Sequence, residues 1–249
     1  MTLYERVGEL HGHRPWGSFL DAGTGPSSIR WLETLATERW TAVTGSPQMR
    51  EKTAQAMAAP PRAQDRLVVG NWMDPELLGG ERFDTVLADY LLGAVEGFAP
   101  YWQGQLFGRL RPLVAKRLYV IGLQPYIHGR PDTTAGRIVN EIGRLRDACL
   151  LLAGDSPYRE YPLDWSLRSL EAAGFRIVDA RLLPITYGPR FIHSQLAMCM
   201  RAIDKLPDRG LAVALHRHAA DVQARALATC KQLGGLRHGD DYLIVAEPN

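Results

Sequence analysis

The sequence lacks the features that mark secreted and membrane proteins. Its three cysteines, Cys149, Cys199 and Cys230, lie far apart and form no CxxC pair. Widely spaced cysteines in odd number are typical of reduced thiols in a protein core, so we expect no disulfide framework. No run of about 18 apolar residues occurs, and the first stretch, MTLYERVGELHGHRPW, is too polar for a signal peptide. We therefore expect a cytoplasmic protein that does not contact a membrane.

Charge of one sign is not concentrated anywhere in the chain. The net charge is +2, and the basic residues are scattered rather than clustered. A duplex-binding protein would present a basic face, so we expect no nucleic-acid partner. The histidine pairs His11/His13 and His216/His218 stand two residues apart with no cysteine or acid at ligand spacing, so we expect no metal site.

Apolar runs and amphipathic stretches alternate along the 249 residues. Apolar runs predict strands at 17–23, 39–45, 65–72, 82–89, 117–123, 176–188 and 241–247. Helical spacing predicts helices at 27–38, 46–58, 100–114, 133–154, 163–175, 191–205 and 209–232. This alternation predicts an α/β fold, with a doubly wound, mainly parallel seven-stranded sheet and helices on both faces.

Two helical insertions interrupt the second half of this pattern, at about 133–153 and 190–232. Each has a single apolar stripe, and neither has an evident core of its own. Both follow strands at the end of the sheet where such folds bind ligands. We therefore expect one domain over 1–249, in which the insertions form a cap above the ligand.

The stretch FLDAGTGPSS (19–28) is an apolar run that ends on an acid and turns through Gly23 and Gly25 into a helix. The glycines are expected to let a ligand approach the backbone and to adopt conformations closed to other residues. Ser27 or Ser28 is the expected helix N-cap. No Gly-Lys pair occurs anywhere, which excludes the P-loop of nucleoside triphosphate enzymes. The dinucleotide pattern GxGxxG also fails, because Ser28 replaces its third glycine.

An acid before the glycines is the remaining arrangement, and here the sequence resembles the class I S-adenosylmethionine-dependent methyltransferases along nearly its whole length. Six stretches follow the order of that family's motifs: FLDAGTGPSS, VTGSPQMREKTAQ, LVVGNW, FDTVLADYLL, LFGRLRPLVAKRLYVIGL and LRSLEAAGFRIVDARLL. The resemblance implies a Rossmann-like methyltransferase fold and S-adenosyl-L-methionine as the cofactor.

The resemblance also implies roles for particular residues. Asp21, Gly23 and Gly25 would hold the amino-acid end of the cofactor, Asn71 and Trp72 the adenine, and Asp89 and Tyr90 would border cofactor and substrate. Plainer roles compete with these: Asp21 also suits a turn cap, Asn71 a turn residue, and Trp72 and Tyr90 the core.

One position departs from the family. Its members usually have an acid at the end of the second strand, which accepts hydrogen bonds from both ribose hydroxyls. Thr44 stands here instead. A threonine hydroxyl forms no charge-assisted pair, so we expect Thr44 to contact the ribose more weakly.

The implied reaction is in-line methyl transfer to an oxygen, nitrogen or sulfur atom of a small molecule, for which positioning supplies most of the rate. If a base is needed, the candidates are His128 and His193, although each also suits a surface or packed position. Tyr126 and Tyr187 are expected to contact the substrate, together with Tyr90. A protein or RNA methyltransferase, or a non-catalytic S-adenosylmethionine-binding protein, remains the alternative.

Overall fold

The computed structural model describes residues 2–249 and divides them into two compact units, each described by itself. The first, called the sheet unit, comprises the chain up to Leu123 together with Arg159–Leu182 and Tyr242–Asn249. The second, called the helical unit, comprises Gln124–Tyr158 and Leu183–Asp241.

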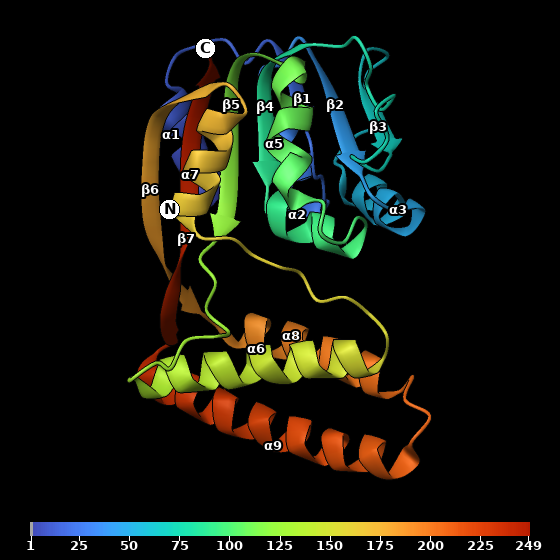
Figure 1. Cartoon of the computed structure of the whole chain (residues 1–249), viewed down its shortest axis with the longest axis vertical. Helices are drawn as coiled ribbons and strands as arrows, with labels where there is room; N and C mark the ends of the chain where they lie inside the picture. Colours follow the sequence, from blue (N-terminus) through green and yellow to red (C-terminus); the bar gives the residue numbers. More distant parts are fainter. Residues whose placement is uncertain (1) are drawn as a thin grey trace. The chain divides into compact units, whose positions relative to one another are not determined.

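The described residues form one seven-stranded sheet with the order β3-β2-β1-β4-β5-β7-β6. Its strands are β1 (Ser18–Asp21), β2 (Arg39–Thr44), β3 (Arg66–Val69), β4 (Phe83–Asp89), β5 (Val114–Leu123), β6 (Phe175–Tyr187) and β7 (Leu236–Pro248). The pairs among β1 to β5 are parallel, and Figure 1 shows β7 running in the opposite direction. The order reverses between β1 and β4, so the carboxyl ends of these strands are where a ligand is expected. The predicted doubly wound, mainly parallel sheet is confirmed.

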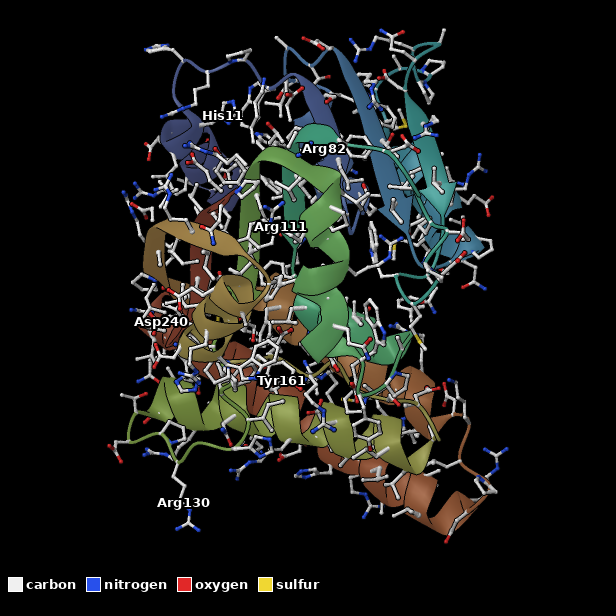
Figure 2. The ribbon with its side chains drawn as sticks, turned by 45° about the horizontal axis from the view of Figure 1, so that its top comes forward. His11, Arg82, Arg111, Arg130, Tyr161 and Asp240 are labelled. Atoms are coloured by element: carbon white, nitrogen blue, oxygen red, sulfur yellow. The ribbon has the colours of Figure 1, made fainter. Side chains whose placement is uncertain are left out.

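Helices cover both faces of the sheet unit. They are α1 (Leu3–His11), α2 (Pro26–Leu32), α3 (Pro47–Ala56), α4 (Leu91–Ala94), α5 (Leu106–Leu110) and α7 (Leu163–Ala172), with short 3₁₀ segments η1 (Val95–Gly97), η2 (Gln103–Gln105) and η3 (Arg111–Leu113). In Figure 1, α5 and α7 lie in front of the sheet and α1 lies behind it. Arg111, labelled in Figure 2, donates to the carbonyl of Gly174 and so joins η3 to the end of α7.

Most predicted helices and strands occur within a few residues of their expected ends. Ser46 caps α3 by accepting from the Met49 amide, and Pro47 begins the helix, as predicted. The single helix expected at 100–114 is instead broken into η2, α5 and η3. Sequence periodicity did not predict α1 or α4.

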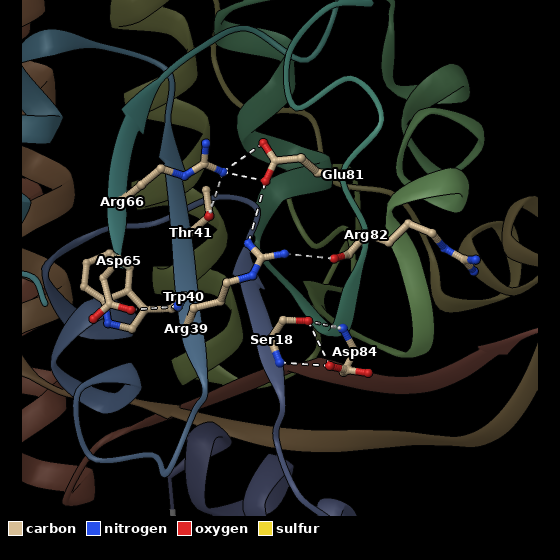
Figure 3. A network of polar contacts seen from close by, with 9 residues as sticks. All are labelled: Ser18, Arg39, Trp40, Thr41, Asp65, Arg66, Glu81, Arg82 and Asp84. Atoms are coloured by element: carbon tan, nitrogen blue, oxygen red, sulfur yellow. Dashed lines mark hydrogen bonds and ion pairs between the residues drawn. The ribbon is translucent and has the colours of Figure 1, made fainter. Parts of the chain in front are cut away.

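At the amino ends of the strands, polar side chains form what we call the amino-end network (Figure 3). Asp84 accepts from the amide and hydroxyl of Ser18, at 2.9 and 2.8 Å, and pairs with Lys116. Burial opposes ionisation of this carboxyl, but Lys116 and Ser18 outweigh it and lower its pKa to about 2.

Two further acids in this network are paired in the same way. Asp65 accepts from the Trp40 amide at 2.9 Å and from the Arg62 guanidinium. Glu81 pairs with Arg66 and Arg39. Each of these acids thus has several donors, and the network holds the starts of β1 to β4 together.

The helical unit is built from α6 (Thr134–Leu152), α8 (Pro189–Ile203) and α9 (Arg209–Leu233), which pack on one another. Their apolar stripes are buried; they include Ile138, Ile142, Leu145, Cys149, Ile192, Leu196, Cys199 and Ile203. Gly234 ends α9 in the left-handed region, as its glycine predicts. Neither insertion was expected to have a core of its own, and the structure shows that the two insertions build one core together. Whether this unit caps a ligand stays a prediction.

None of the helices described between residues 2 and 249 has both the length and the apolar character needed to cross a bilayer.

Candidate functional site

The site begins at the turn between β1 and α2, at the carboxyl end of β1. Gly25 is the N-cap of α2, and the Ser28 hydroxyl accepts from its amide at 3.0 Å. The prediction that Ser27 or Ser28 would be the N-cap was therefore wrong, because the helix begins one turn earlier, at Pro26. The backbone of Gly25 is extended, with φ −146° and ψ −176°, and Gly23 is also outside the left-handed region. The glycines are thus not required by backbone strain.

Space, rather than strain, explains the glycine at position 25. A Cβ added to Gly25 would meet nothing within 4 Å, whereas one added to Gly23 would lie 3.1 Å from Leu91. Gly23 therefore allows close packing of α4 against the turn. Gly25 leaves open space at the start of α2, where a ligand could approach the backbone.

Asp21, the last residue of β1, is an acid without a partner. Its side chain is fully buried, and neither carboxyl oxygen has a hydrogen-bond partner among residues 2–249. Burial raises the pKa of this carboxyl to about 7, although the nearby Ser28 and Thr24 hydroxyls oppose the shift. A buried acid without a donor or cation is costly, so it marks a place that a ligand can complete.

A second acid, Asp89, is half-buried at the end of β4 and lies close enough to Asp21 to raise the pKa of Asp21 further. Burial also raises the pKa of Asp89. The Tyr4 hydroxyl of α1 donates to Asp89 Oδ2 at 2.7 Å. Neither Tyr4 nor helix α1 was predicted from the sequence.

A signal for α1 was nevertheless present in the sequence. Thr2 and Glu5 form a capping box, in which the Thr2 hydroxyl accepts from the Glu5 amide and the Glu5 carboxylate accepts from the Thr2 amide. The spacing Thr-x-x-Glu before an apolar residue indicates a helix start. It would have placed Tyr4 in the first turn of a helix.

The ends of β2 and β3 supply the residues predicted to hold adenine and ribose. Thr44 is buried at the end of β2. Asn71 follows β3; its amide donates to the Phe98 carbonyl and its carbonyl accepts from the Met73 amide, each at 3.0 Å. The Asn71 side chain therefore already has the turn role that competed with adenine binding, and it would have to exchange these bonds to contact a ligand.

Trp72 lies in the core instead of lining the ligand side. Its side chain is 4% exposed, and its indole N–H donates to the Ala22 carbonyl at 2.8 Å. This buried position contradicts the predicted contact between Trp72 and adenine, because the indole packs inside the protein and holds the β1 turn through Ala22. Phe98 is a better aromatic for the ligand side, because it is 44% exposed and its ring covers Gly45, directly after Thr44. No motif in the sequence indicated Phe98.

Tyr90, directly after β4, has a left-handed backbone with φ 48° and caps α4. A non-glycine residue in this region is strained, and such strain gathers at functional sites. The side chain is partly buried, which fits the predicted border position as well as a packed one.

The remaining predicted residues belong to the helical unit. The His128 and His193 side chains are both exposed. The expectation that either reaches an enclosed pocket is therefore not supported, and a catalytic role for them stays a prediction. Tyr126 is buried near His238, with the rings edge to face, and Tyr187 stacks on Phe191 with ring centroids 4.0 Å apart.

Comparison with known proteins gives structural likeness without sequence likeness. No family model matches the chain, and no curated protein matches it significantly. A Bacillus halodurans C-125 protein assigned to the methyltransferases is similar over 99% of each chain, with 14% identity and a TM-score of 0.62. The mycolic acid cyclopropane synthase CmaA1, complexed with SAH and CTAB, is similar over 99% of this chain and 86% of its own, with 17% identity and a TM-score of 0.56.

A third solved structure is coclaurine N-methyltransferase bound to N-methylheliamine and SAH. It is similar over 98% of this chain and 71% of its own, with 12% identity and a TM-score of 0.54. Identities this low establish architecture and leave the reaction to be argued from the site. The chain has the Rossmann-like fold of the class I S-adenosylmethionine-dependent methyltransferases.

Proposed function

We propose that this protein is an S-adenosylmethionine-dependent methyltransferase. The observation that carries the proposal is Asp21, a fully buried carboxylate without a partner, beside a turn with open space at Gly25. A cationic group of a ligand would pair with this carboxylate. The open space at Gly25 would let the same ligand approach the protein backbone at the turn. The methyltransferase fold supports the same conclusion, since two neighbours of this fold were crystallised with SAH.

The residues of the sheet unit have separate roles in this proposal. Asp21 and Asp89 receive the ammonium of the methionine part, and the open turn at Gly25 lies beside it. Thr44 donates to or accepts from one ribose hydroxyl. Phe98 offers an apolar face for adenine, and Asn71 contacts its edge after exchanging its present bonds. When bound, S-adenosylmethionine supplies a methyl group already activated by the sulfonium.

We further propose that the acceptor is a small molecule with an oxygen, nitrogen or sulfur nucleophile. The structure of coclaurine N-methyltransferase bound to N-methylheliamine, a small amine, supports this class. The two insertions follow β5 and β6 in the chain, and we propose that the helical unit contributes to acceptor recognition through Tyr126 and Tyr187. Because His128 and His193 are exposed, positioning rather than a histidine base is the favoured source of rate.

A non-catalytic S-adenosylmethionine-binding role is the second candidate. One observation favours it: Thr44 replaces the acid that grips the ribose in the family, so the cofactor would be held more loosely. A protein or RNA acceptor is a third possibility within the methyltransferase class.

Calorimetry and a transfer assay test the proposal together. The purified protein should bind S-adenosylmethionine and S-adenosylhomocysteine without added metal, and a nicotinamide dinucleotide should not bind. Transfer of a labelled methyl group to a panel of small oxygen, nitrogen and sulfur nucleophiles then separates enzyme from binding protein. If only a lysate accepts label, treatment with RNase or protease distinguishes the macromolecular acceptors. Binding of the dinucleotide without binding of either adenosyl ligand would refute the proposal.

A further inference from the structure

Helix α1 delivers a tyrosine hydroxyl to the carboxyl end of the sheet. Tyr4 stacks on Trp31 of α2, with ring centroids 5.1 Å apart, and its hydroxyl donates to Asp89 at 2.7 Å. Burial and the neighbouring Asp89 both raise the pKa of Tyr4, so the phenol stays protonated and remains a donor.

The other end of α1 is fastened to the sheet, which holds Tyr4 in place. His11, labelled in Figure 2, stacks on Trp16 with centroids 3.5 Å apart, and its Nδ1 lies 2.9 Å from the Tyr119 hydroxyl of β5. Arg117 donates to the Leu10 carbonyl at 3.3 Å. An anchored helix loses little further freedom when Tyr4 engages its partner, so the hydrogen bond is preorganised.

The hydroxyl meets a carboxylate in an unusual electrostatic setting. Asp21 is buried and Asp89 is half-buried at adjacent strand ends, and neither forms an ion pair within the described chain. Two like charges at one place repel, and a single donor on Asp89 lowers the penalty for its ionisation. It also fixes one carboxyl oxygen, which leaves the other oriented for a ligand.

We propose that Tyr4 is a positioning residue of the cofactor site, whose hydroxyl holds Asp89 ready to receive the primary ammonium of the ligand's amino-acid part. The inference rests on the proposed function, because it assumes a ligand with that group. Tyr4 touches the carboxylate and acts on the ligand through it.

Three probes separate this role from a structural one. S-adenosylhomocysteine has the ammonium and the carboxylate, its decarboxylated form keeps only the ammonium, and 5′-methylthioadenosine has neither. Tyr4→Phe removes one oxygen and keeps the ring stack on Trp31. We expect this change to weaken binding of the two ammonium ligands by roughly tenfold to a hundredfold and to leave 5′-methylthioadenosine binding unchanged.

Tyr119→Phe is the matched control. It also removes one phenol hydroxyl that joins α1 to the sheet, but that hydroxyl contacts His11 and not Asp89. Thermal melting should show a similar loss of stability for the two variants, while only Tyr4→Phe changes the ratio of affinities among the probes. Equal weakening of all three probes by Tyr4→Phe would mean a structural role and would overturn the inference.

A double variant gives a second, independent measurement. Asn at position 89 has no charge for Tyr4 to stabilise, so Tyr4→Phe should have little effect on ammonium binding in an Asp89→Asn background. An unchanged loss in that background would overturn the inference. If the wild type binds none of the probes, the proposed function itself fails and the inference fails with it. Wild-type binding that Tyr4→Phe leaves intact refutes the inference alone.

Discussion

The acids at the amino ends of the strands and those at the carboxyl ends differ in the partners that the protein gives them. At the amino ends, Asp65 and Asp84 each accept from several donors, and Figure 3 shows those from Trp40 and Ser18. The pKa of Asp84 is lowered to about 2 by Lys116 and Ser18 against the effect of burial. At the carboxyl ends, Asp21 has no partner and Asp89 accepts from a neutral phenol. The acids at the amino ends are thus paired by several groups of the protein, whereas those at the carboxyl ends have one neutral donor or none.

This difference divides the acids of a single sheet into those that the protein pairs with several donors and those that it does not. An acid paired in the folded state contributes stability, whereas an unpaired buried acid lowers it. The glycines follow the same division. Gly17, at the amino end, has φ +60°, and a Cβ there would come under 3.0 Å from the Asp84 side chain, whereas a Cβ at Gly25 would enter open space.

The largest effect should come from this glycine pair. Gly25→Val should abolish measurable cofactor binding, a loss of more than about 3 kcal/mol, because the added side chain fills the ligand's space. Its melting temperature should stay near that of the wild type. Gly17→Ala should instead lower the free energy of unfolding by about 2 kcal/mol, through the left-handed backbone and the contact with Asp84. Calorimetry and denaturant unfolding measure both. Retained binding in Gly25→Val would place the ligand elsewhere.

The next largest effect should come from two isosteric changes, one to an acid at each end of the sheet. Asp65→Asn puts an amide group against the Trp40 N–H or the Arg62 guanidinium, so it should lower the free energy of unfolding by about 2 kcal/mol. Asp21→Asn removes a buried unpaired charge, so it should raise the stability of the ligand-free protein at pH 8 by about 1 kcal/mol. It should also weaken binding of S-adenosylhomocysteine by about 2 kcal/mol. Destabilisation by Asp21→Asn would show that this acid has an internal partner.

The β1 turn, with Asp21 at its start, could be predicted from the sequence, and the reason is physical. The strand–turn–helix at FLDAGTGPSS is local, so its apolar run, acid and glycines predicted both the β1 turn and the position of Asp21. The cap of α3 was likewise predictable, because Ser46 and Pro47 act within one turn. Local chemistry of this kind depends on few residues.

The parts that were missed depend on contacts between distant segments. Phe98 lies against Gly45, 53 positions away in the chain, and neither residue by itself indicates that the fold brings the two together. Trp72 was assigned to the ligand side, since a strand-end tryptophan suits both roles and only tertiary packing chooses between them. The shared core of the helical unit arises in the same way, from stripes on α6 and α8 that meet only in the fold.

A smaller effect should appear in the pH dependence. Because the folded-state pKa of Asp21 is raised to about 7, its protonated form is favoured by folding. Its contribution to stability is full below the unfolded value of about 4 and is lost as the pH rises through about 7. From pH 6 to 8 this amounts to about 1 kcal/mol in the ligand-free protein.

The groups that face Asp21 are Asp89 from β4, Tyr4 from α1 and the hydroxyls of Thr24 and Ser28. Burial lowers the pKa of His11, so its contribution to stability changes with pH in the opposite sense to that of Asp21. The difference between wild type and Asp21→Asn isolates the carboxylate. Affinity for S-adenosylhomocysteine should rise with pH through about 7 in the wild type only. Parallel stability profiles for the two proteins would contradict the assignment.

The smallest effect should follow from adding an acid to the carboxyl ends. Thr44→Asp restores a carboxylate that can accept from both ribose hydroxyls, which a threonine cannot do. Position 44 is buried, so the new acid would lack a donor in the free protein, as Asp21 does, and should lower its stability. Hydrogen bonds from the ribose hydroxyls offset the cost of burying the new carboxylate, so we expect a net gain in affinity of less than about 1 kcal/mol. The control Thr44→Val should show a small loss of affinity. Calorimetry with 5′-methylthioadenosine, which retains the ribose, measures the effect without the ammonium. A severe loss of affinity in Thr44→Asp would mean that the end of β2 does not face the ribose, and that the second acid of this site has to be sought in another strand.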